Sequence, residues 1–129
     1  MAATHSTAAR DAATNAVTAL IGTSGKLKFR LSGTVGAPGT AVATLTFSAT
    51  AFGASSSGTA TANAITSDSS ATGNASPVAN ATFETSGGTV VVHCAVGTSG
   101  SDINMPAGLT IPASSIVGCT SLTYTALSA

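Results

Sequence analysis

Charged residues are scarce in this chain. It has four Lys or Arg and four Asp or Glu among 129 residues, and its formal net charge is zero. A nucleic-acid-binding protein needs a basic face that displaces counterions from phosphates, so this balance argues against nucleic acid as a partner. A surface with few charged side chains is poorly soluble when it is exposed to solvent, so we expect partners to cover much of it.

Long apolar runs and aromatic residues are scarce too. No segment approaches the ~20 consecutive apolar residues of a membrane-spanning helix, so we expect no membrane partner. Arg10 and Asp11 stand where the apolar stretch of a secretory signal would run, which argues against such a signal. With no Trp and one Tyr, the sequence also lacks the aromatic platforms on which sugar rings stack.

The two cysteines, Cys94 and Cys119, allow one disulfide by parity. Disulfides belong to oxidising compartments, and no export signal is evident. Two reduced thiols that pack as small core residues are therefore favoured over a Cys94–Cys119 bridge.

Groups that could hold or move protons are thinly spread. His93 and Cys94 resemble a base–thiol pair, but neighbouring side chains on a strand point to opposite faces. They have no further ligands at metal-binding spacing, and the lone Asp102 is too little for a calcium site. The sequence therefore predicts no enzyme, no metal site and no cofactor.

The longest apolar run, Val90–Val96, is rich in β-branched residues and too short for an ordinary helix. Such a run is typical of a strand shielded on both faces. The glycines of Ser86–Gly88 suit a tight turn into it from the preceding Val78–Thr85. We therefore expect Val90–Val96 to be the central strand of an antiparallel structure.

An alanine-rich helix is expected before the strands. Ser6 or Thr7 can cap it, its apolar stripe runs to about Ile21, and Gly22 suits its C-terminal end. A stripe of alanines stabilises a helix only weakly, so this one should lie against a sheet or a neighbouring subunit. We accordingly divide the chain into a leader and anchoring helix, 1–22, and a β domain, 23–129.

The clearest alternation lies in Lys26–Ser32. Leu27, Phe29 and Leu31 point one way, and the basic Lys26, Lys28 and Arg30 point the other. A basic row of this kind is either a solvated face that discourages aggregation or a docking surface for an acidic partner. The candidate partner-binding residues are these three and Arg10, the remaining basic residue.

Seven or eight short strands follow one another at intervals of about 8–15 residues. They include Val42–Ser48, Thr59–Ile65, Leu109–Ile111 and roughly Ile116–Leu127, with a long exposed loop at Thr66–Pro77. This spacing is typical of an antiparallel β-sandwich or jelly roll, here with a short N-terminal helix. The predicted core residues are Leu27, Phe29, Leu45, Phe47, Val90, Val92 and Leu122.

In outline the chain resembles small virion proteins of tailed bacteriophages. The segments that carry the resemblance keep their order over most of the chain: Ala8–Leu20, Leu27–Arg30, Ala43–Ala54, Gly58–Ile65, Val96–Asn104 and Ser121–Thr125. The loop Ser32–Thr40 differs from the tyrosine- and proline-rich form of that group, and the strand around Phe83 lacks a second aromatic residue.

The resemblance implies a β-sandwich decoration or cement subunit of the capsid. Its partners would be the major capsid protein and further copies of itself on the capsid lattice. It would be made in the host cytoplasm and reside on the capsid exterior. The alternative is a tail or fibre module that recognises a host surface glycan or protein.

Overall fold

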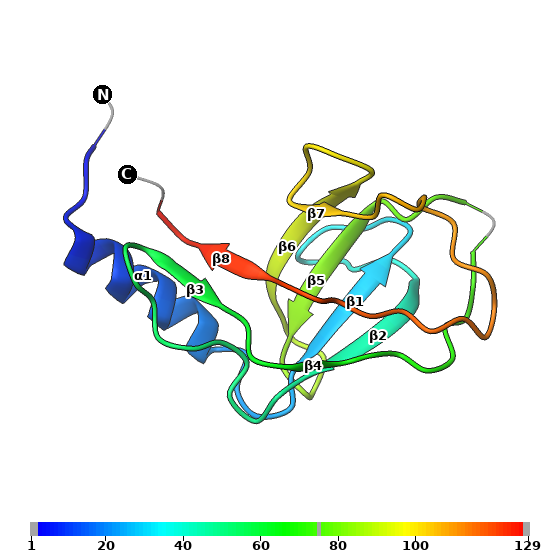
Figure 1. Ribbon diagram of the computed structural model, residues 1–129, viewed down its shortest axis with the longest axis horizontal. Helices are drawn as coiled ribbons and strands as arrows, with labels where there is room; N and C mark the ends of the chain where they lie inside the picture. The colour runs from blue at the N-terminus through cyan, green and yellow to red at the C-terminus, as the bar shows by residue number, and fades with distance from the viewer. Residues whose placement is uncertain (1–2, 75, 128–129) are drawn as a thin grey trace.

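A computed structural model describes residues 3–74 and 76–127; residues 1–2 of the leader, residue 75 of the predicted long loop and residues 128–129 lie outside this part. The protein is mainly β, with one N-terminal helix and a curled, mostly antiparallel sheet, so the predicted β-sandwich-like fold is confirmed (Figure 1). The described elements are α1 (Thr7–Ala19), β1 (Lys26–Arg30), β2 (Ala41–Phe47), β3 (Thr59–Thr61), β4 (Ile65–Thr66), β5 (Asn80–Glu84), β6 (Val90–Gly97), β7 (Ile103–Asn104) and β8 (Thr123–Thr125).

The main sheet has the strand order β4-β2-β1-β5-β6-β7, with β1 and β5 at its centre. Its pairs are antiparallel except β6 with β7, which is parallel. Strands β3 and β8 form a separate two-stranded ribbon that extends from the sheet towards α1 (Figure 1). None of the described helices is long and apolar enough to cross a membrane.

The alternation predicted for β1 sets the two faces of the sheet. Leu27 lies opposite Leu45 on one side and Phe83 on the other, and all three are buried. We call this side the apolar face. Next to it the rings of Phe47, Phe52 and Phe83 lie with centroids 5.7–5.9 Å apart, at the favourable spacing of aromatic clusters.

The expectation that Val90–Val96 is shielded on both faces is wrong. The residues of β5 are all buried, whereas the first four of β6 are only half-buried. The reason is position, because β5 lies between two full strands while β6 has only the two-residue β7 on its outer side. Val90 and Val92 are accordingly outside the buried core, and the other five predicted core residues are in it.

The helix begins where predicted and ends at Ala19, two residues before the predicted Ile21. The Ser6 hydroxyl accepts a hydrogen bond from the Ala9 amide (3.1 Å), and Gly22 follows the helix with φ +70°. Its partner is a sheet of its own chain, because α1 packs on β3 and β8. The buried Thr14 hydroxyl donates to the Gly58 carbonyl (2.7 Å) and accepts from the Ala126 amide (3.1 Å), which fastens α1 to both strands.

The C-terminal third contains fewer strands than predicted. Beyond β7, among the described residues, only Thr123–Thr125 forms a strand, and it pairs with β3 instead of finishing the main sheet. Residues 105–122 include Pro106 and Pro112, which have no N–H to donate to a ladder. This segment is held by the predicted long loop, which is therefore not free: the amides of Ala71, Asn74 and Val78 donate to carbonyls at Ser115, Ile111 and Leu109.

Candidate functional site

The predicted basic row, Lys26, Lys28 and Arg30, does lie on one face of the sheet, but its environment differs from expectation. On the neighbouring strand β5, Glu84 pairs with Lys26, Thr82 with Lys28 and Asn80 with Arg30. We call this side the polar face. Its centre is Glu84, a carboxylate that is fully buried.

Arg30 is buried, which corrects the expectation that it faces solvent or a partner. Its Nη2 lies 2.6 Å from Glu84 Oε2, and its Nε donates to the Thr82 hydroxyl at 3.1 Å. The Thr82 hydroxyl in turn donates to Glu84, and Nη1 of Arg30 donates to the Gly39 carbonyl. A buried guanidinium with this many partners is part of the framework of the fold.

Lys28 completes the cluster on its exposed side. Its Nζ lies 3.3 Å from Glu84 Oε1, an ion pair without hydrogen-bond geometry, and 25% of its side chain is exposed. Burial alone would raise the pKa of Glu84, but hydrogen bonds from Arg30 and Thr82 and the charges of Arg30 and Lys28 outweigh it and hold the pKa below its ordinary value. Glu84 is therefore an ionised structural group.

The other basic candidates keep some exposure. Lys26 donates to the Thr46 hydroxyl (3.0 Å). Arg10 lies on α1, apart from the basic row, and its Nε is buried without a hydrogen-bond partner among the described residues. Lys26, Lys28 and Arg10 thus remain candidates for partner binding, but the structure does not bring them together into one patch.

His93 and Cys94 lie on opposite faces, as the strand geometry requires. His93 pairs with Thr82 on the polar face, and Cys94 pairs with Ala81 on the apolar face. Burial, reinforced by the charge of Asp102, raises the pKa of the Cys94 thiol to about 11, so it is not a thiolate at neutral pH. Both cysteines are free thiols, as predicted, and the described residues contain no cluster of three or more metal-ligating side chains.

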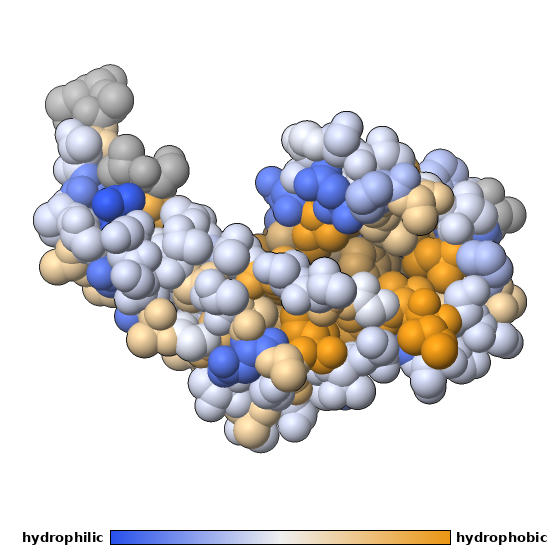
Figure 2. All heavy atoms as spheres, viewed as in Figure 1, coloured by the Kyte–Doolittle hydropathy of each residue, from blue (hydrophilic) through white to orange (hydrophobic). Residues whose placement is uncertain are grey.

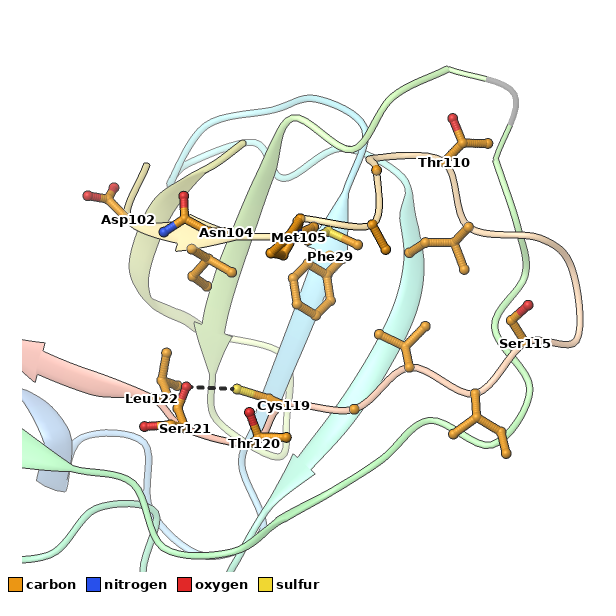
Figure 3. A pocket seen from close by; sticks show the side chains of 18 of the residues that line it. Phe29, Asp102, Asn104, Met105, Thr110, Ser115, Cys119, Thr120, Ser121 and Leu122 are labelled. Carbon is orange, nitrogen blue, oxygen red and sulfur yellow. Dashed lines mark hydrogen bonds between the residues drawn. The ribbon is translucent and has the colours of Figure 1, made fainter. Parts of the chain in front are cut away.

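The feature that sequence reasoning missed is a hollow of about 860 Å³ on the apolar face (Figures 2 and 3). It lies between β7 and the segment 115–123, with the Phe29 ring pointing into it. Its apolar lining includes Phe29, Ile103, Met105, Ile111, Ile116, Val117 and Leu122. The sequence signal for this hollow is the prolines and glycines of residues 105–118. They interrupt regular strands, so this segment cannot form a second sheet that covers the apolar face.

Polar and apolar residues line the hollow about equally, but charged groups are few. Asp102 is the one charged residue in the lining, and its carboxylate accepts from the Ala95 amide (2.9 Å). The half-buried thiol of Cys119 donates to the Ser121 carbonyl (3.4 Å), and burial raises its pKa (Figure 3). The hollow can therefore accept an uncharged apolar group, but it offers little to polarise a substrate.

A second, smaller hollow of about 330 Å³ lies at the end of α1. It is lined by residues 49–54 and by Asn15, Thr18, Ala19, Gly22 and Thr23. Leu20, between these lining residues in the sequence, is 66% exposed. Comparison with known proteins adds no assignment, because no protein-family model, curated protein or solved structure matches this chain.

Proposed function

We propose that this protein is a non-enzymatic structural protein of a tailed-bacteriophage virion. It binds the outer capsid surface and cements neighbouring major capsid subunits. The observation that carries the proposal is apolar surface left uncovered on a chain with few charges: Leu20, Val35 and Ile116 are exposed, and Ile116 lines the larger hollow. Surface of this kind marks a subunit that is covered in an assembly.

The contact with the capsid is the C-terminal end of α1. The exposed Leu20 supplies apolar area, and Lys26, six residues further along the chain, supplies a charge for an acidic rim. Rim ion pairs contribute about 0–1 kcal/mol each, so the apolar contact provides most of the affinity and the lysine mainly orientation. This keeps the predicted anchor on the helix, since Ala8, Ala12 and Ala16 of its stripe are exposed, and centres it on Leu20 at the helix end.

Cementing follows from repetition. One copy contributes a modest interface, about 800 Å² per partner. Many copies on a symmetric lattice raise the barrier to disassembly together, because a capsid subunit can leave only when several contacts break at once. Attachment favours the mature lattice when only that geometry presents all contacts.

Sedimentation with isolated phage particles tests the proposal. Purified protein mixed with heads that lack it should pellet with the heads and not with tails. Leu20→Asp should reduce pelleting at least about tenfold, since it places a charge in the apolar contact. Thr18→Ser, on the last turn of the same helix, is the matched control and should pellet like the unchanged chain.

Other outcomes discriminate between the functions. Pelleting with tails would replace the proposal with a tail or fibre module. Binding to neither particle, or equal binding of Leu20→Asp and the unchanged protein to heads, would contradict the capsid contact at the end of α1.

A further inference from the structure

The loop between β1 and β2, residues 32–39, is a closed and narrow hairpin. Gly33 bridges to Pro38, the Gly39 amide donates to the Ser32 carbonyl (3.1 Å), and the Thr34 amide donates to the Ala37 carbonyl (3.0 Å). A Cβ on Gly33 would collide with the Gly39 nitrogen, and Gly33 has φ +110°, so this close approach requires glycine. The loop therefore holds one shape.

The buried ion pair fixes this loop to the sheet. Arg30, which is held by Glu84, donates to the Gly39 carbonyl at the base of the loop. At the tip, residues 34–37, stands Val35, which is 57% exposed and has no charged neighbour in the loop. An apolar side chain on a rigid loop can dock with little loss of conformational entropy, whereas a mobile loop would first have to become ordered.

The hollow on the apolar face has matching properties. Its volume is about 860 Å³, its lining is about equally apolar and polar, and the apolar Ile116 on it is 75% exposed. Figure 2 shows hydrophobic residues gathered around this hollow on the face turned to the viewer. The loop carries no charged residue, and the one charged residue in the lining of the hollow is Asp102. The Asp102 carboxylate already accepts a hydrogen bond from the Ala95 amide, so contact would bury no unpaired charge.

The loop and the hollow belong to opposite faces of the sheet. Phe29 points into the hollow, and the next residue, Arg30, holds the loop from the polar face. Neighbouring side chains on a strand point in opposite directions. The loop therefore cannot fill the hollow of its own chain, and a pair of complementary surfaces on opposite faces suits head-to-tail contact between copies.

We propose that the protein associates with itself head to tail, with the loop tip at Val35 of one copy seated in the hollow at Ile116 of the next. This contact covers two of the three exposed large apolar residues of the described chain. It uses surfaces separate from the end of α1, so it does not depend on the virion assignment.

Analytical ultracentrifugation of the full chain over a concentration series tests the proposal. The unchanged protein should pass from monomer to species larger than a dimer as its concentration rises. Val35→Asp and Ile116→Asp should each weaken association at least about tenfold, because each puts a charge into a central apolar contact. Leu20→Asp, an equally exposed residue outside both surfaces, should associate normally. Circular dichroism and thermal melting establish that each variant is folded.

Mixing the two variants gives the sharper result. The Val35→Asp chain keeps its hollow and the Ile116→Asp chain keeps its loop tip, so an equimolar mixture should form dimers and nothing larger. An unchanged protein that stays monomeric, a mixture that stays monomeric, or a Leu20→Asp chain as weakened as the other two would overturn the proposal. An unchanged protein that stops at a dimer would overturn the head-to-tail arrangement.

Discussion

The two faces of the main sheet are both buried at β5, but by different means. On the apolar face Phe83 is covered by Phe47, Phe52 and Tyr124. On the polar face Glu84 is covered by groups that bond to it. Apolar contact is not directional and tolerates gaps, whereas a buried carboxylate needs donors at defined positions.

This difference explains why the apolar face is partly open and the polar face is closed. The apolar face keeps an open hollow beside its buried core, since an incomplete cover costs only the contacts that are missing. The polar face is closed around Glu84, because an unpaired charge there would cost several kcal/mol. The open face is thus available for partners, and the closed one fixes the shape of the β1–β2 loop.

Removing Arg30 is expected to have the largest effect. Arg30→Met takes the guanidinium from Glu84, Thr82 and Gly39 together, and loss of one partner of a buried ion pair costs about 3–5 kcal/mol. Urea unfolding measures this change. The double variant Arg30→Met/Glu84→Met should recover most of the loss, because an apolar replacement of the whole pair leaves no buried charge. A double variant less stable than Arg30→Met alone would mean that the pair is not the source of the loss.

Conservative change on the apolar face should have a smaller effect. Phe47 contacts the rings of Phe52 and Phe83, and Phe47→Leu keeps an apolar group there, so its cost should stay below about 1.5 kcal/mol. Phe47→Ala, which leaves a cavity, should cost about 3–5 kcal/mol. Unfolding by urea compares the two. Equal losses for Leu and Ala would show that this face is as exacting as the polar one.

A moderate decrease in pH is expected to have the smallest effect on stability of the three changes. It acts through Glu84 on the polar face and only in acid. The pKa of Glu84 is lower in the folded protein than its ordinary value of 4.5, so its ionised form stabilises the fold. That contribution is complete above about pH 4.5 and is lost as pH falls through the folded pKa. The melting temperature should therefore decrease below about pH 4.5.

Glu84→Gln separates this effect from that of other carboxylates. The variant should be less stable at neutral pH but show a shallower decrease with acid. Part of the decrease should remain, because hydrogen bonds from Ser55 and Gly58 also lower the pKa of Asp11. Asp11→Asn is the matched control. If Glu84→Gln kept the full acid dependence, Glu84 would not be the group that links stability to pH.

Local patterns in the sequence determined much of the fold. The alternation in β1 predicted which side chains are buried on the apolar face, because a strand alternates its side chains whatever surrounds it. Ser6 and Gly22 marked the helix ends, and the glycines near residue 88 marked the β5–β6 turn, for equally local reasons. The free state of the two thiols also agreed with the prediction.

Only the tertiary structure decided which strand is central and what the charges do. Burial of a strand depends on its neighbours in the sheet, so the polar-looking β5 became more buried than the valine-rich β6. Glu84 and Arg30 are 54 residues apart, and no local pattern indicates that they meet. The hollow likewise depends on how segments distant in sequence fail to fill one face, which is a property of packing and not of any one segment.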